Sequence, residues 1–294
     1  MRRSWLAATL LVSSGCAIAA LPSPWESSVA GCVWEVCVYP VASGEFLDFR
    51  ARNAGPVVAT VSISFKLLQN FRLTDSVPVV KTVQSGENIV LTRVQRVDPT
   101  ASINAEPRVE IDLGSDSTRP DPNVVYGIPF GGAEPRQLIA TFGTGGHSFE
   151  TPYSLDFGMP EGTPVLAARD GVVAVVQDSL PGQGQEGDLI GKANVVVVAH
   201  SDETLATYAY LQNGIPVAVG DSISRGELLG FSGAGGPREL PHLHFHVGKR
   251  LTRTQNRTIQ VILESPSGGV QGLSEGSWCL PARQMQRARR SARR

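Results

Sequence analysis

Histidine is scarce in this chain, with five residues in 294, and three of the five fall within six consecutive positions. Aromatic residues make up only 6% of the chain and segments with helical periodicity are few, whereas glycine (31) and proline (20) are plentiful. These counts favour many short strands joined by turns over a helical fold. The formal net charge is only −1, which excludes the bulk attraction to nucleic acid of a strongly basic chain.

The chain also lacks a long hydrophobic run at its N-terminus. The apolar segment 5–12 follows Arg2 and Arg3 and is too short to anchor the protein in a bilayer. Together with the small residues that follow, this pattern predicts a signal peptide over residues 1–20. We therefore expect an exported protein, either periplasmic, in the cell envelope or secreted, with no integral membrane span after cleavage. Cys16 resembles a lipoprotein cleavage box only faintly, because the usual leucine three residues earlier is missing, so lipidation ranks second.

Cysteine is rare as well, and removal of the signal leaves Cys32, Cys37 and Cys279. Export permits disulfides, and an odd count leaves one thiol unpaired. Cys32 and Cys37 cannot bridge within one extended strand, because five residues span about 16 Å and a disulfide tolerates about 7 Å between Cα atoms. Either Trp34 and Glu35 form a turn between them, or one of the two pairs with Cys279. The sequence leaves both alternatives open.

The pattern along the chain predicts two domains. Residues 21–113 contain no histidine, and their alternating apolar runs and turn signals predict a small immunoglobulin-like β-sandwich. Strands are expected at residues 46–51, 57–65, 77–83, 89–97 and 109–113. Residues 114–126 are rich in Ser, Asp and Pro and predict a linker.

The second expected domain covers residues 127–250 and is mostly antiparallel β. Its predicted hairpins lie at 162–173 and 194–211, with His200 as a turn or surface residue of the second. Residues 251–294 are expected to form a C-terminal extension with a basic tail from Ala282. A solvated tail is the expectation, and attraction to an anionic envelope polymer is an open alternative.

The most informative segment is Pro241–His246, in which histidine alternates with leucine and phenylalanine. In a β-strand, side chains repeat on one face every second residue, so His242, His244 and His246 should share a face. Neighbouring histidines on that face lie roughly 6.6 Å apart, which lets one imidazole bind a metal while the next reaches the metal's water. A row of imidazoles is poor core material, so the segment predicts a metal site.

A catalytic zinc usually takes three protein ligands and leaves one position for water. His147 follows a glycine-rich loop that can aim a ligand. Asp156 lies opposite apolar neighbours on a predicted strand. His244 completes a His-Asp-His set, and His242, one step along the same face, is then placed to act as general base.

At this point the chain resembles the lysostaphin/LytM-type zinc endopeptidases, over roughly residues 127–248. The motifs that carry the resemblance occur in the family's order: Gly146-His147, Asp156, Gly162-Thr163-Pro164-Val165, Asp170-Gly171-Val172-Val173, Tyr208-Ala209-Tyr210-Leu211, Val219-Gly220-Asp221 and His242-Leu243-His244-Phe245. The resemblance implies a lysostaphin-type peptidase fold, a Zn²⁺ cofactor and peptidoglycan peptides as substrate.

By this resemblance, the zinc ligands map onto His147, Asp156 and His244, and a catalytic histidine maps onto His242. Asn194 matches a position that commonly contacts substrate in the family, Tyr208 is also expected to bind substrate, and His246 is expected to be a rim or supporting residue rather than a ligand. Tyr210 stands where the family carries a second catalytic histidine. Strand alternation puts Tyr208 and Tyr210 on one face, and the motif position favours Tyr210 at the groove. A tyrosine hydroxyl can donate to an oxyanion but carries no positive charge.

Two functions follow from these residues. The first is an exported zinc metalloendopeptidase that hydrolyses peptide bonds in peptidoglycan, with a β-sandwich that positions the enzyme or masks its groove. The second is a catalytically impaired module that binds peptidoglycan or activates another cell-wall hydrolase. A biotinyl or lipoyl carrier is disfavoured, because the only lysine in the central part of this domain is Lys192, in an irregular loop.

Overall fold

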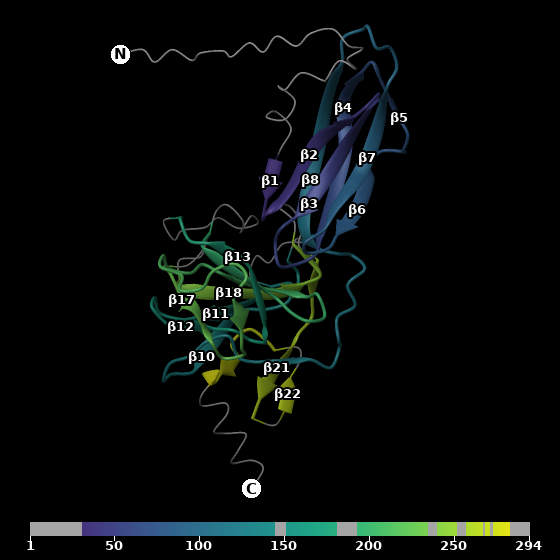
Figure 1. Ribbon diagram of the computed structural model, residues 1–294. Helices are drawn as coiled ribbons and strands as arrows, with labels where there is room; N and C mark the ends of the chain where they lie inside the picture. The colour runs from purple at the N-terminus through teal and green to yellow at the C-terminus, as the bar shows by residue number, and fades with distance from the viewer. Residues whose placement is uncertain are drawn as a thin grey trace, which may run out of the picture.

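The computed structural model describes residues 31–144, 151–180, 193–234, 240–251, 257–266, 268–270 and 273–282. Every secondary-structure element in these residues is a β-strand, which confirms the all-β class (Figure 1). No helix within the same ranges is long and apolar enough to cross a membrane. The expected signal peptide and the basic tail beyond Ala282 lie outside the described residues.

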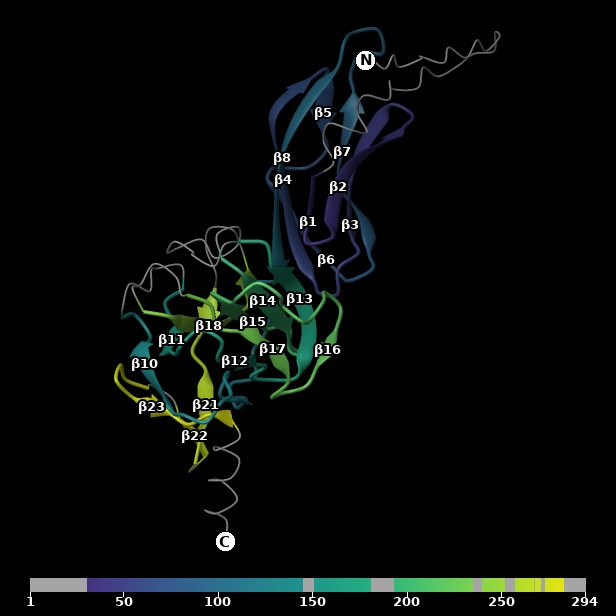
Figure 2. The same ribbon diagram turned by 90° about the vertical axis from the view of Figure 1, so that its left-hand side faces the viewer.

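The N-terminal domain is built from two sheets. One has the order β1-β2-β3-β7-β5 and the other β19-β8-β4-β6, and strands β1 to β8 stand together at one end of the molecule (Figures 1 and 2). The rings of Phe49 on β3 and Phe65 on β4 meet between the sheets, with centroids 5.1 Å apart. The arrangement is a two-layer sandwich, whose immunoglobulin-like relationship stays a prediction. The strands are β1 (Gly31–Val33), β2 (Val36–Ser43), β3 (Phe46–Asn53), β4 (Ala59–Gln69), β5 (Phe71–Leu73), β6 (Val79–Val83), β7 (Asn88–Arg96), β8 (Asn104–Gly114) and β19 (Arg250–Leu251).

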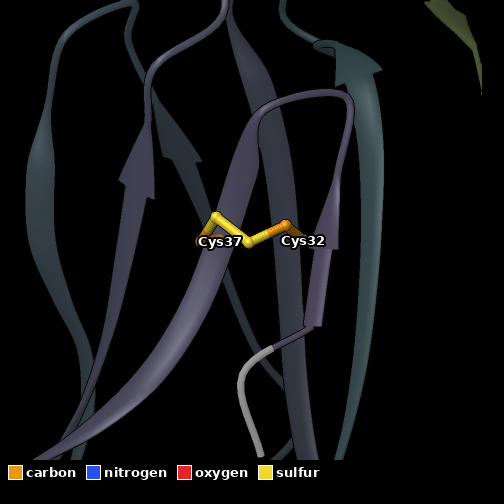
Figure 3. Close-up of a disulfide and its surroundings, with 2 residues drawn as sticks. All are labelled: Cys32 and Cys37. Carbon is orange, nitrogen blue, oxygen red and sulfur yellow. A yellow bond between two sulfur atoms is a disulfide. The ribbon is translucent and has the colours of Figure 1, made fainter.

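A tight hairpin determines which cysteines pair, a question that the sequence left open. Trp34 and Glu35 have φ values of 51° and 64°, and a two-residue type I′ turn requires φ above zero at both central positions. The turn brings Cys32 on β1 opposite Cys37 on β2, with Cα atoms 4.1 Å apart, and the two are disulfide-bonded (Figure 3). Cys279 is a free, buried thiol.

The C-terminal domain is organised around a 9-stranded antiparallel sheet in the order β16-β13-β14-β15-β18-β11-β10-β23, with β20 beside β18. One face packs in an apolar core that includes Phe157, Tyr208 and Phe245. Strands β12 and β17 pair with each other and add Val165 and Leu229 to this core. The hairpin expected at residues 162–173 is therefore wrong, because β12 and β13 belong to different sheets. The sheet strands are β10 (Arg136–Ala140), β11 (Leu155–Gly158), β13 (Gly171–Gln177), β14 (Val195–Ala199), β15 (Leu205–Ala209), β16 (Ser222–Ile223), β18 (His242–Gly248), β20 (Thr258–Ile259) and β23 (Trp278–Cys279); the added pair is β12 (Pro164–Leu166) and β17 (Leu228–Phe231).

The expected domain boundary at residue 250 does not match the strand pairing. After that residue, β20 pairs with β18 and β23 pairs with β10. A small sheet joins β21 (Ile262–Ser265) to β22 (Gly268–Val270) and, in parallel, to β9 (Val125–Tyr126). The described part of the expected C-terminal extension is therefore built into the folded domain. Sequence periodicity missed it because these strands have only two to four residues.

The two domains share a strand and a set of ion pairs. β19 follows β18 in the chain but pairs with β8 of the N-terminal sandwich. Beside this pairing, Arg250 donates to Asp112 (Nε–Oδ2, 3.0 Å) and to Asp116 (Nη1–Oδ2, 2.8 Å). The expected linker is also held in place, since Thr118 donates to Glu203 of the β14–β15 turn. The N-terminal domain is thus fixed on the C-terminal domain rather than tethered.

A cavity of about 640 Å³ lies at this interdomain junction, lined by Pro56–Val58 of the sandwich and by the β14–β15 turn. His200 borders it but is only 5% exposed, so it is a turn residue, as predicted, without being a surface residue. Burial lowers the pKa of His200 to about 4, although Nδ1 lies 2.8 Å from the Asp170 carbonyl oxygen. Arg169 lowers this pKa further.

Substitution of Gly114 tests how closely β8 approaches the chain next to β19. Its φ is +82°, and a Cβ there would lie 2.2 Å from the Lys249 carbonyl oxygen. Gly86 is the matched control, because its φ is +80° and a Cβ added there would meet nothing within 4 Å. We expect Gly86→Ala to cost about 1–2 kcal/mol for its left-handed backbone, and Gly114→Ala about 1–3 kcal/mol more for overpacking. Urea unfolding measures both, and equal costs would contradict the close approach of the two domains.

His200 predicts a pH dependence of stability. In the unfolded chain His200 takes up a proton near pH 6.5, whereas in the folded protein it does so only near pH 4. The neutral His200 therefore makes its full contribution to the free energy of unfolding above about pH 6.5. This free energy should fall by roughly 3 kcal/mol as the pH drops to about 4. His200→Asn removes the titrating group and should flatten this part of the curve. Unfolding free energies at pH 7, 5.5 and 4.5 measure the effect, and parallel curves for the two proteins would refute it.

Candidate metal and catalytic site

The site is set by the pairing of β11 with β18. In this antiparallel register Asp156 lies opposite His244 and Gly158 lies opposite His242. Leu243 and Phe245 of β18 are fully buried in the apolar core, as the alternating pattern predicted. The apolar residues therefore turn the histidines to the other face of the sheet.

Asp156 and His244 form a close buried pair. Their exposed fractions are 2% and 6%, and His244 Nδ1 lies 2.8 Å from Asp156 Oδ1. The second carboxylate oxygen, Oδ2, is 3.9 Å from Nε2 of His242. One carboxylate thus faces both imidazoles, which brings three of the predicted site residues together.

His242 is held in one tautomer by the backbone. Its Nδ1 lies 2.9 Å from the carbonyl oxygen of Leu240, which can only accept a hydrogen bond. Nδ1 therefore carries the proton in the neutral ring, and Nε2 keeps its lone pair. That lone pair is the proton acceptor that a general base requires.

Tyr210 lies at the site because the backbone turns there. β15 ends at Ala209, and Tyr210 has a φ of 68°, a left-handed conformation that interrupts strand alternation. Its ring centroid is 5.0 Å from that of His242 and 5.9 Å from that of His244. The sequence position predicted this location.

Tyr208 does not lie at the site, which corrects the expected substrate contact. It is fully buried against Phe245, with ring centroids 5.2 Å apart, and its hydroxyl accepts a 2.8 Å hydrogen bond from the Ala168 amide. Burial raises the pKa of its hydroxyl far above the ordinary value. The expectation that Tyr208 and Tyr210 share a face is wrong, because the left-handed residue ends the alternation between them.

Asn194 is likewise committed to the protein itself. It is fully buried, and its amide nitrogen lies 3.1 Å from each of the carbonyl oxygens of Leu180 and Leu211. Its Oδ1 accepts from the Leu180 amide at 3.0 Å. Both polar atoms of the side chain are thus engaged by the protein, and the bond to the Leu211 carbonyl fixes the backbone next to Tyr210.

The donor chemistry of the Asp156–His244 pair fits a zinc ion. A carboxylate oxygen and an imidazole nitrogen are ordinary zinc ligands, and buried atoms 2.8 Å apart are close enough to bind one cation together. The third predicted ligand, His147, lies outside the described residues. Within those residues, no three His, Cys, Asp or Glu side chains form a cluster able to hold a metal.

Comparison with known proteins points to one family. Residues 150–257 match the model of peptidase family M23. The chain is 30% identical over 120 residues to the DD-carboxypeptidase/endopeptidase Mpg of Neisseria meningitidis, covering 41% of this chain and 25% of that protein. It is 37% identical over 92 residues to the peptidoglycan DD-endopeptidase ShyA of Vibrio cholerae, covering 31% and 19%. The matches thus span a quarter or less of these relatives.

Among solved structures, the catalytic domain of the prophage-encoded M23 protein EnpA from Enterococcus faecalis is similar. It is 24% identical to this chain, with a TM-score of 0.31, and the match covers 40% of this chain and 83% of that domain.

Tyr208 offers a test of the two faces of the sheet. We expect Tyr208→Phe to lower the free energy of unfolding by about 1–3 kcal/mol, because the buried Ala168 amide loses its acceptor. Zinc content should be unchanged, since the hydroxyl points away from Asp156 and His244. Urea unfolding and metal analysis of the purified variant measure the two quantities. A loss of bound zinc would place Tyr208 in the site after all.

Proposed function

We propose that this chain is an exported zinc metalloendopeptidase that hydrolyses peptide bonds in bacterial peptidoglycan, in cell-wall remodelling or lysis, and the match of residues 150–257 to peptidase family M23 supports this proposal. The observation that carries the proposal is the buried Asp156–His244 pair with the Nε2 of His242 beside it. The relatives Mpg and ShyA are named as peptidases, and ShyA as acting on peptidoglycan, which supports the substrate class.

In this proposal His147, Asp156 and His244 hold the zinc. The metal, when bound, supplies a Lewis acid that polarises the scissile carbonyl and lowers the pKa of a water molecule toward ~7. The protein's contribution is to keep both donor atoms of the described pair buried and aligned. Asp156 also leaves Oδ2 directed toward His242.

His242 acts as the general base. Its Nε2 accepts a proton from the attacking water while Nδ1–H stays on the Leu240 carbonyl. The ring then carries a positive charge, and Asp156 Oδ2 at 3.9 Å stabilises it. The ring can return this proton to the amine that leaves.

In this proposal Tyr210 donates to the developing oxyanion. Its ring lies against both histidines, which supports its hydroxyl as the side-chain donor in place of the imidazole implied by the family resemblance. Loss of one such donor typically costs on the order of 100-fold in rate.

The second candidate function is a module that binds peptidoglycan or activates another cell-wall hydrolase. The uncharged Tyr210 favours it, since a neutral hydroxyl stabilises an oxyanion less than a positively charged imidazole. In either case the sandwich would position the protein on its target or mask the site, and the shared β8–β19 pairing holds it against the C-terminal domain.

Release of soluble muropeptides from purified sacculi tests the two candidates. We expect wild-type protein with bound zinc to release fragments, His244→Ala to release none, and Tyr210→Phe to be slower by about 100-fold. Tyr208→Phe is the matched control and should retain the wild-type rate, because its hydroxyl lies on the opposite face.

Three outcomes decide the matter. Release that needs His244 supports the peptidase. Release by Tyr210→His alone makes the natural protein a binding or activating module. A protein that contains no zinc and releases no fragments, either as wild type or as Tyr210→His, would refute the peptidase proposal. The identity of the released fragments gives the bond that is cut.

A further inference from the structure

His246 is the member of the histidine strand to which the proposed mechanism gives no task. It is 2% exposed, and its Nδ1 lies 3.2 Å from Nε2 of His244, with ring centroids 5.3 Å apart. His244 is therefore contacted through both ring nitrogens, by Asp156 at Nδ1 and by His246 at Nε2.

The geometry excludes His246 as a ligand to the same metal ion as Asp156. The two nitrogens of an imidazole point away from each other, and Asp156 and His246 lie on opposite sides of the His244 ring. A cation shared by Asp156 and His244 sits on the Nδ1 side. His246 is on the far side of the ring and contacts His244 rather than Asp156.

Two tautomers of His244 compete at this position. With the proton on Nδ1, the ring donates to Asp156 Oδ1 at 2.8 Å, and Nδ1 then has no lone pair with which to bind a cation. With the proton on Nε2, the ring donates to His246 Nδ1, and the lone pair on His244 Nδ1 can bind the metal. The first tautomer is favoured by the carboxylate, so the second needs an acceptor of its own.

We propose that His246 is a positioning residue that supplies this acceptor and so fixes the metal-binding tautomer of His244. Metal-binding histidines commonly donate their second ring nitrogen to such a partner, whose loss weakens metal binding about 10–100-fold. The acceptor here is an imidazole rather than a carboxylate. Neutral His246 then carries its own proton on Nε2, on the side of its ring away from His244.

Thr207 extends the polar row beyond His246. It lies directly opposite His246 in the β15–β18 register and is 1% exposed. Its hydroxyl has no hydrogen-bond partner among the described residues. Residues directly opposite on one face of an antiparallel pair have Cβ atoms about 5 Å apart, so this hydroxyl is a near polar neighbour of His246.

The inference rests on the proposed function only in taking Asp156 and His244 as zinc ligands. The experiment is zinc competition against a fluorescent chelator at pH 7.5, with the full chain as wild type, His246→Leu and His246→Asn. Leu fills a similar space without an acceptor, whereas Asn can present its Oδ1 near the position of Nδ1. We expect zinc binding to weaken about 10–100-fold in His246→Leu and to recover to within about threefold of wild type in His246→Asn.

Tyr208→Phe is the control for stability, because it weakens the same sheet from its other face and should keep wild-type zinc affinity. Equal affinity in wild type and His246→Leu would overturn the inference, as would equal losses in the Leu and Asn variants, which would mean a packing role. Wild-type protein that binds no zinc would overturn it together with the peptidase. If wild-type protein binds zinc but releases no muropeptides, only the proposed peptidase activity is refuted, and the role of His246 in zinc binding is still decided by the affinities.

Discussion

The pairing of β11 with β18 is the constraint on which the rest of the site depends. It places Asp156 opposite His244, and it is fixed by Leu243, Phe245 and Phe157, which are buried on the other face. A slip of one residue would move every side chain of a strand to the opposite face. The histidines would then enter the apolar core and their neighbours would be exposed. The hydrophobic core thus maintains the polar geometry, although none of its residues reacts.

The left-handed backbone of Tyr210 determines that its ring lies at the site, and neighbouring residues hold this conformation. A left-handed residue other than glycine costs about 1–2 kcal/mol, and here the surrounding hydrogen bonds hold it. The Leu211 amide donates to the Asn194 carbonyl at 3.2 Å, and the Asn194 side chain donates to the Leu211 carbonyl. Asn194 therefore acts on the site through the backbone. This is why a position expected to contact substrate is instead fully buried.

The two domains are coupled by the chain itself, which passes directly from a strand in the sheet of one domain to a strand in a sheet of the other. The histidine strand β18 is followed at once by β19, which completes a sheet of the sandwich. Displacement of the sandwich would therefore pull on the strand that carries His242, His244 and His246. Sequence patterns divided the chain near residue 250, because two-residue strands carry no periodicity to detect. Long-range pairing, which local pattern does not encode, joins the later strands β20 and β23 to the sheet that holds β18.

The sequence by itself determined the all-β class, the hairpin over residues 194–211 and the shared face of the three histidines, because alternation is a local property with a period of two. Motif order pointed to Asp156, His242, His244 and Tyr210. Only the tertiary structure decided which acceptor each imidazole nitrogen meets, that Tyr208 turns away, and that Cys32 bonds Cys37 across a tight turn. These features depend on backbone dihedral angles and on pairing between distant strands, and both are settled by packing of the whole domain.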